Sequence, residues 1–208
     1  MKFDRPLQLV YKYGRYTLTG VGIFFSVFAV LPAKTIAGNA PGSANADIKV
    51  LGTSNLHAWS MEDKDVTCTA RFTYAAGKTV PASLATFNFS FPVHSLTSGK
   101  SGMDSKAYDA MKAKTSSDIT FTATASTITP GTGDAFQVKS DGNLTIAGVT
   151  KPVVLLAGCT VKTDGSVSCT GSNTLLMSDY QIKPPTYMLG ALRTGNKLTI
   201  DFSMLVKK

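Results

Sequence analysis

Apolar and polar side chains alternate with a period of two over most of the chain after residue 47. In residues 84–94 the odd positions from Phe87 to Val93 are apolar, and the even positions Thr86, Asn88, Ser90 and His94 are polar. In residues 197–206 every even position is apolar, from Leu198 to Val206. Strict alternation of this kind is typical of antiparallel strands that bury one face and leave the other in water. The pattern predicts eight strands, at residues 48–56, 66–74, 84–94, 119–125, 136–146, 153–161, 166–177 and 197–206.

Short turn-like connections at residues 63–64, 132–134 and 164–165 join several of these expected strands. Short links between successive strands favour an up-and-down order. Eight antiparallel strands with one dry face can close into a barrel, which removes the exposed sheet edges. The sequence therefore predicts an all-β fold, an eight-stranded antiparallel up-and-down barrel. A two-sheet sandwich would bury the same pattern and remains the alternative.

Two segments depart from the alternation. Residues 102–114 have helical character, with Met103, Ala107, Tyr108 and Met111 spaced along one face. One amphipathic helix beside a barrel is expected to act as a lid or as a packing element. The other segment, residues 178–194, contains two consecutive prolines and is long for a loop in a compact domain, which indicates a functional loop.

The N-terminal region has the order of a secretory signal peptide: basic residues up to position 20, an apolar run at 21–31, then small residues. We expect residues 1–40 to be the signal peptide, with cleavage after Ala37, Ala40 or as late as Ala46, and residues 47–208 to form the folded domain. An uncleaved signal anchor is the alternative, although the apolar run is shorter than the roughly 20 residues of a membrane span. The protein is expected in the periplasm or outside the cell.

The net charge of the chain does not indicate a particular binding partner. The whole chain carries a net +8, and residues 1–40 hold +4 of it, so +4 remains on the rest. This surplus is spread along the chain and is not interleaved with aromatic residues, which argues against nucleic-acid binding. A soluble basic surface is the simplest interpretation, and weak contact with anionic membranes is the other.

Residues that could support catalysis are scarce. The chain has two histidines, His57 and His94, and neither has a second ligand at a spacing that suits a metal ion. No G-x-S-x-G elbow and no Gly-rich phosphate loop occurs in the sequence. Asp63 and Asp65 are expected to lie in a turn and to be solvated. We therefore expect a protein that is not an enzyme and that needs no cofactor or metal.

The segment at residues 144–155, LTIAGVTKPVVL, closely resembles a segment of the YceI-like family of bacterial periplasmic proteins. Three further segments resemble the family in the same order along the chain: residues 55–59, residues 95–121 with the expected helix, and residues 179–198. Two features differ: the Arg-Asp pair often found before the helix is reduced to Asp104, and Ser117 replaces the proline expected before the fourth strand. These changes bear on how the polar end of a ligand is held.

The resemblance implies a lipocalin-like barrel whose pore takes a polyisoprenoid or a similar long apolar lipid. The residues make this plausible, because an eight-stranded barrel can hold one ligand and because Phe and Met suit an apolar cavity. The alternative is a structural or protein-interaction β-domain with a filled core. Ten residues from the dry faces, the helix and the long loop are the expected ligand contacts: Phe89, Phe91, Met103, Tyr108, Met111, Phe121, Tyr187, Met188, Phe202 and Met204.

Three cysteines complete the sequence picture. Cys159 and Cys169 flank the expected turn at residues 163–165. If that turn is a three-residue loop with Gly165 left-handed, the two cysteines face each other and can form a disulfide in an oxidising compartment. A two-residue turn would stagger them instead. Cys68 lies on a dry face and is expected to remain a buried thiol.

Overall fold

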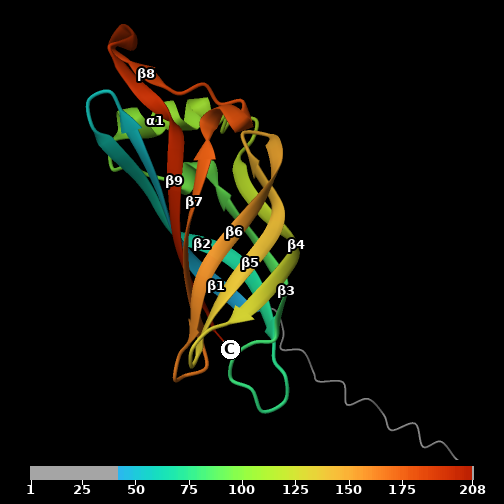
Figure 1. Ribbon diagram of the computed structural model, residues 1–208. Helices are drawn as coiled ribbons and strands as arrows, with labels where there is room; N and C mark the ends of the chain where they lie inside the picture. Colours follow the sequence, from blue (N-terminus) through green and yellow to red (C-terminus); the bar gives the residue numbers. More distant parts are fainter. Residues whose placement is uncertain (1–41, 208) are drawn as a thin grey trace, which may run out of the picture. The chain divides into compact units, whose positions relative to one another are not determined.

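The structure, a computed structural model, describes residues 42–207, so the expected signal peptide lies outside the described residues. Nine strands, one α-helix and three short 3-10 helices make up the described part (Figure 1). Their bounds are β1 (Gly42–Ser54), β2 (Ala58–Thr73), β3 (Ser83–Pro92), η1 (Val93–Ser95), α1 (Ser101–Ala110), β4 (Asp118–Pro130), β5 (Ala135–Ile146), β6 (Val149–Val161), β7 (Val167–Leu176), η2 (Met177–Tyr180), β8 (Thr186–Tyr187), η3 (Met188–Gly190) and β9 (Leu192–Val206). No helix within this range is long and apolar enough to span a bilayer.

Eight of the strands form a closed antiparallel barrel, which confirms the predicted fold. Strands β1 to β7 pair in chain order, β9 pairs with β7, and β1 closes the ring against β9. The closing ladder sets Ile48 opposite Phe202 and Val50 opposite Ile200. Because this ladder joins the first and last strands, the sandwich alternative is wrong. Strand β8 adds two residues to the edge of β9, beyond the end of β7.

One expected turn was placed wrongly. Asp63 and Lys64 lie inside the long strand β2, whereas the chain turns between β1 and β2 at residues 55–57. Near Asp63 the register between β1 and β2 shifts: Ala46 faces Val66, whereas Ile48 faces Asp63. Extra residues in one strand make a β-bulge, and aspartate, which flanks this bulge, is also common in turns. Asp63 is not solvated: it is buried, and Ser95 Oγ donates a hydrogen bond to its carboxylate.

The helix is close to its expected position but ends earlier, at Ala110 instead of Lys114. The next turn stops the helix because Lys112 adopts a left-handed backbone conformation with φ of 55°. A left-handed residue cannot continue a right-handed helix. Met111 still packs against the core from the capping position.

The barrel divides into a filled end and a hollow end. The filled end contains a tight apolar cluster in which Phe72 and Phe136 pack edge to face, with ring centroids 5.9 Å apart. In Figure 1 this is the end near the C-terminus, whereas α1 and β8 lie at the opposite, hollow end. Because aromatic and aliphatic side chains fill the lower end, a ligand has room only above it.

The disulfide lies in the filled end. Cys159 and Cys169 face each other on β6 and β7 and are bonded, with their Cα atoms 4.1 Å apart. The turn below them has three central residues, and Gly165 is left-handed with φ of 81°. The backbone N–H of Lys162 donates to the backbone oxygen of Ser166 over 2.8 Å, and the backbone N–H of Gly165 donates to the backbone oxygen of Lys162 over 2.9 Å. Cys68 is a buried free thiol on β2. Burial raises the pKa of this thiol to about 11, so it is protonated and unreactive at neutral pH.

Removing the disulfide is expected to weaken the fold without abolishing it. Replacing both Cys159 and Cys169 by alanine should lower the free energy of unfolding by about 2–3 kcal/mol, because so short a loop restricts the unfolded chain only modestly. Urea unfolding followed by circular dichroism measures this change. A reductant should shift the midpoint of the wild type and of Cys68→Ala alike, and should leave the double variant unchanged. A reductant-insensitive wild type would contradict the assignment.

Candidate functional site

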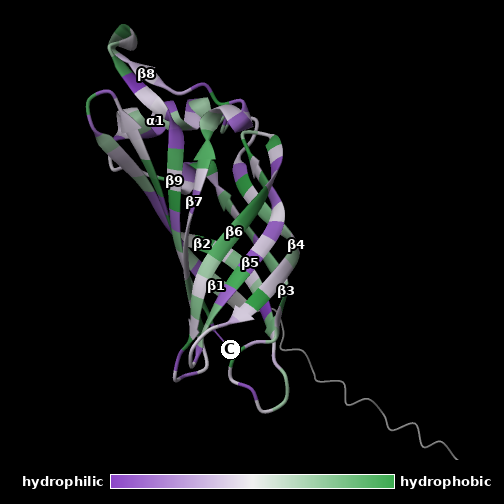
Figure 2. Cartoon of the chain, in the orientation of Figure 1, coloured by the Kyte–Doolittle hydropathy of each residue, from purple (hydrophilic) through white to green (hydrophobic). Residues whose placement is uncertain are grey.

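A cavity of about 1010 Å³ occupies the hollow end of the barrel. This volume lies at the upper end of the roughly 300–1,000 Å³ usual for ligand sites. Its walls come from the inward-facing positions of the strands, and Figure 2 shows hydrophobic and hydrophilic residues alternating along them. At its lower limit Cys68 and Met204 line the cavity, with their sulfur atoms 3.3 Å apart. The cavity is therefore a long apolar chamber with a closed floor.

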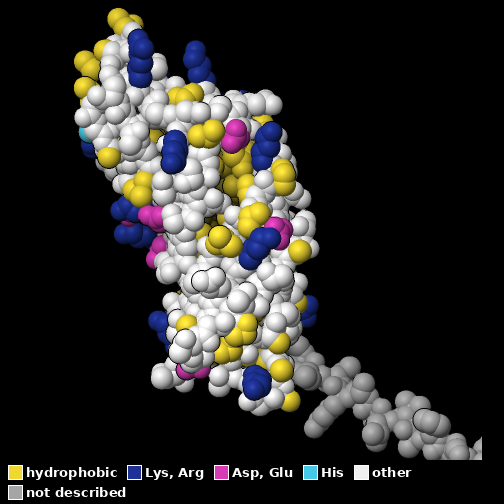
Figure 3. Space-filling model, in the orientation of Figure 1, with side chains coloured by type: hydrophobic (Ala, Val, Ile, Leu, Met, Phe, Trp, Pro, Cys, Tyr) yellow, Lys and Arg dark blue, Asp and Glu magenta, His cyan; other side chains and the backbone are white. Residues whose placement is uncertain are grey.

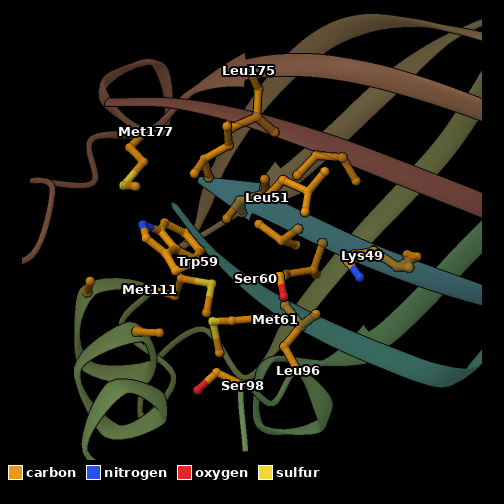
Figure 4. A pocket seen from close by; sticks show the side chains of 18 of the residues that line it. Lys49, Leu51, Trp59, Ser60, Met61, Leu96, Ser98, Met111, Leu175 and Met177 are labelled. Atoms are coloured by element: carbon orange, nitrogen blue, oxygen red, sulfur yellow. The ribbon is translucent and has the colours of Figure 1, made fainter. Parts of the chain in front are cut away.

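Trp59 dominates the wall near the open end. Its indole lies against Gly52 on the neighbouring strand, where a Cβ atom would come within 2.1 Å of the ring, so only glycine fits. The indole N–H donates to the backbone oxygen of Thr53 over 3.1 Å, which fixes the orientation of the ring. Figure 4 shows Trp59 among Met61, Met111 and Met177. The polar atom is thus satisfied, and the apolar surface of the ring is left for a ligand.

Helix α1 lies at the mouth of the cavity and is held there by two tyrosines. The Tyr108 hydroxyl donates to the backbone oxygen of Leu96 over 2.7 Å, and its ring packs against His94 with centroids 4.4 Å apart. The Tyr187 hydroxyl, from β8, donates to the backbone oxygen of Gly102 at the start of the helix. Burial, and secondarily the charge of Asp104, raises the pKa of both phenols. Both hydroxyls therefore remain protonated donors at physiological pH.

The structure brings eight of the ten expected contact residues to the cavity wall. They are Phe89, Phe91, Met103, Met111, Tyr187, Met188, Phe202 and Met204. Met188 is also 78% exposed, so it lies at the rim. Their contact with a ligand stays a prediction.

Tyr108 and Phe121 do not line the cavity. Tyr108 points its hydroxyl at the chain before the helix, as described above, and so serves to position α1. Phe121 is 1% exposed and lies behind the wall. Its ring leans over Gly142 and packs against Phe87 and Phe89, which take the cavity-facing places. Alternation shows which face of a strand is dry, but not whether a dry residue meets the cavity or packs into the wall.

Several wall residues were not singled out from the sequence. They include Trp59, Met61, Phe87, Leu144, Leu155, Leu175, Leu198 and Ile200. Most of them lie on the same alternating faces as the predicted residues, so the alternation of apolar and polar positions could have identified them. Trp59 and Met61 are the exception, because the bulge in β2 interrupts the alternation between them and Val66.

The charged residues on the cavity wall are all lysines: Lys49, Lys100 and Lys106. Lys49 is paired with Glu62, with 2.8 Å between Nζ and Oε1. The hydrogen bond and the charge of the partner raise the pKa of Lys49 and lower that of Glu62. Asp104, on the helix beside Lys106, accepts hydrogen bonds from the backbone N–H and the hydroxyl of Ser98. Lys100 and Lys106 are exposed at the mouth, so the chamber itself is neutral.

Neither histidine is arranged for catalysis. His57 is exposed at the rim, and its Nδ1 lies 2.9 Å from the backbone oxygen of Ala58. His94 packs under the Tyr108 ring. Among residues 42–207, no group of three or more His, Cys, Asp or Glu side chains could hold a metal ion. The arrangement suits non-covalent binding of an apolar molecule.

Comparison with known proteins agrees with this geometry. Residues 44–205 match the YceI-like domain, which covers most of the chain. No protein with a curated description matches the sequence.

Several solved structures share the fold. BcnA from Burkholderia cenocepacia is 16% identical, covers 78% of this chain and 96% of its own, and superposes with a TM-score of 0.61. A polyisoprenoid binding domain from Saccharophagus degradans is 10% identical, covers 81% and 99%, and gives 0.60. The YCEI protein of Campylobacter jejuni is 20% identical, covers 75% and 84%, and gives 0.54. At such identities the likeness establishes the fold.

Proposed function

We propose that this chain, which belongs to the YceI-like domain family, binds one long apolar lipid of the polyisoprenoid type without forming a covalent bond. The observation that carries the proposal is the apolar chamber of about 1010 Å³ inside a closed barrel. A structural domain with a filled core, the alternative from the sequence, would not contain such a space. The S. degradans domain, described as polyisoprenoid binding, supports the same ligand class.

The energetics favour a long chain as the ligand. Each buried CH₂ group contributes about 0.8 kcal/mol, so a chain gains affinity with every unit that the chamber covers. The wall is made of Phe, Leu, Ile and Met side chains, and methionine adapts to irregular ligand surfaces. With no acidic side chain among the described wall residues and lysines at the mouth, the chamber suits the tail and the mouth suits the polar end.

A carrier role requires an aqueous compartment, and we propose that the protein is exported. The proposal rests on the basic, apolar and small-residue order of residues 1–40. Fractionation of the source cells followed by N-terminal sequencing tests it. A mature N-terminus shortly after Ala37, Ala40 or Ala46 is the expected result, and an intact Met1 in the membrane fraction would contradict it.

Mass spectrometry of lipids extracted from the protein, purified from its own cells without detergent, tests the binding function. We expect a prenyl lipid in near-stoichiometric amount. The Phe89→Asp variant, purified in the same way, is the control, because a carboxylate on the wall should exclude the lipid while common contaminants persist. Equal lipid content in both proteins, or none in the wild type, would contradict the proposal.

A further inference from the structure

Strands β6 and β7 pair over only part of their length. Their ladder runs from Val161 opposite Val167 to Ala157 opposite Gly171 and ends there. Both strands continue: β6 pairs with β5 up to Val149, and β7 pairs with β9 up to Leu176. Residues 149–156 of β6 and 172–176 of β7 therefore have no ladder between them. The barrel wall is slit along its upper half, between two strands that are each well paired on the other side.

A second unpaired stretch, between the upper part of β2 and β3, is filled and gives a useful comparison. There the segment after η1 runs along β2, and Thr97 and Glu62 exchange two backbone hydrogen bonds of 2.8 and 3.0 Å. Ser95 adds its hydrogen bond to Asp63. The chain thus inserts a segment where β2 leaves β3. Within the described residues no segment pairs with the facing edges of β6 and β7 in this way.

The slit is apolar along its β6 edge and at the upper end of its β7 edge, from the cavity to the outside. Leu155 on β6 and Leu175 on β7 line the cavity. On the outer face beside the slit, Val154 is 45% exposed, Leu156 60% and Leu176 39%, in a barrel whose other outward positions are mostly polar. Figure 3 shows a recess with hydrophobic side chains over the region where β6 and β7 separate. An apolar surface therefore continues from the chamber to the solvent at this side of the barrel.

Asn173 bridges the slit. Its side-chain Nδ2 donates to the backbone oxygen of Val154 over 3.3 Å, and its Oδ1 accepts from the backbone N–H of Thr174 over 2.8 Å. The second bond orients the amide toward β6. Asn173 also lines the cavity. One long hydrogen bond from a side chain takes the place of the ladder that would otherwise close the wall.

The lower end of the slit is fixed. The last ladder pair is Ala157 and Gly171, and the Cys159–Cys169 disulfide lies directly below it. Gly171 holds the Phe202 ring and the Leu156 carbonyl so closely that a Cβ atom would come within 2.3 and 2.4 Å of them. Covalent and steric restraints thus keep β6 and β7 together below, and a single hydrogen bond holds them above. The strands can separate further only at the top.

We infer that the slit between β6 and β7 is a lateral portal through which the lipid chain enters and leaves the chamber, with Asn173 as its clasp. A chain that passes sideways along Val154, Leu155 and Leu156 keeps apolar contact with β6 from the chamber to the solvent. It avoids the passage of the entire tail through the mouth, where Trp59 and Met111 lie next to each other (Figure 4) and Tyr187 ties β8 to the start of α1. The inference rests on the proposed lipid-binding function.

A reversible crosslink across the slit tests the portal. A continued ladder would set Leu155 opposite Asn173, so a disulfide in the Leu155→Cys/Asn173→Cys pair forms only when the two edges close on each other, and it then holds the slit shut. The protein is loaded with nitrobenzoxadiazole-labelled geranylgeraniol under reducing conditions, oxidised, and mixed with phosphatidylcholine vesicles. We expect transfer of the probe to the vesicles to slow at least ten-fold after oxidation and to recover with reductant.

The control crosslink joins the same two strands where they are already paired. Thr160 faces Ser168 below the slit, so oxidised Thr160→Cys/Ser168→Cys should release the probe as fast as its reduced form. As a second variant, Asn173→Ala removes the clasp and should speed release several-fold. Equal release from the oxidised and reduced Leu155/Asn173 variant, with Asn173→Ala unchanged, overturns the portal while lipid binding stands. A probe that binds none of the proteins overturns the proposed function and the portal together.

Discussion

Replacing Phe121 by alanine is expected to lower the free energy of unfolding by about 3–5 kcal/mol while leaving the cavity wall in place. A buried phenylalanine contributes its transfer free energy and also prevents a void. Phe121 is 1% exposed and packs against two rings, with centroids 5.5 Å from Phe87 and 5.3 Å from Phe89. Gly142, beneath the ring, has no side chain that could fill the space. Urea unfolding gives the loss directly.

Phe89→Ala is the matched control for this change. It also replaces a phenylalanine by alanine, and the Phe89 ring is the one that stacks on Phe121. Phe89 is half-buried and faces the chamber, so its removal enlarges a space that already exists. We expect a smaller stability loss than for Phe121→Ala and a larger loss of lipid affinity. Similar effects of both variants on both measurements would show that the wall and the core behind it are one packing unit.

Much of the fold could be predicted from the sequence because it depends on local alternation. The apolar series in residues 197–206 reappears in the structure as the inward face of β9, opposite β1 and β7. The bulge at Asp63 could not be predicted, because the aspartates there are equally compatible with a turn. What distinguishes the bulge from a turn is the pairing of Ile48 with Asp63 across the strands, and that contact is tertiary.

The sequence predicted which face of each strand is buried, but not which buried residues reach the cavity. Phe89 and Phe121 look the same in the sequence, since both are aromatic residues on alternating strands. In the structure they are cross-strand neighbours, yet only Phe89 reaches the chamber. The slit could not be predicted for a related reason. Residues 149–156 have the composition of a fully paired strand. The alternation of apolar and polar residues does not show where a ladder between two strands ends.

The two ends of the barrel differ in packing. The disulfide and the cluster around Phe72 and Phe136 close the lower end. The upper end leaves a chamber and an incomplete ladder, which a protein with a single uniform core would not retain. The packed lower end supplies the close apolar contacts that the hollow upper end lacks. A ligand in the chamber would then supply the missing apolar contacts, and lipid binding is expected to stabilise the protein.

Introducing a carboxylate into the chamber gives the largest expected effect on binding. Phe89→Asp should reduce affinity for a prenyl lipid by at least about 100-fold. The charge is hydrated while the chamber is empty, and the lipid must displace that water at a cost of several kcal/mol, where each 1.4 kcal/mol is a factor of ten. Titration of the purified protein with labelled geranylgeraniol, followed by fluorescence, measures the change.

Ser90→Asp is the control, because it adds the same charge one residue away on the exposed outer face of β3. Its affinity should equal that of the wild type. Circular dichroism must show that Phe89→Asp retains the strand spectrum. Affinity of the folded Phe89→Asp protein should rise as the pH falls, since protonation removes the charge that the lipid has to dehydrate. Wild-type affinity in a folded Phe89→Asp protein at neutral pH would mean that the lipid lies elsewhere, because no apolar chain can cover an unpaired carboxylate on this wall without losing most of its binding free energy.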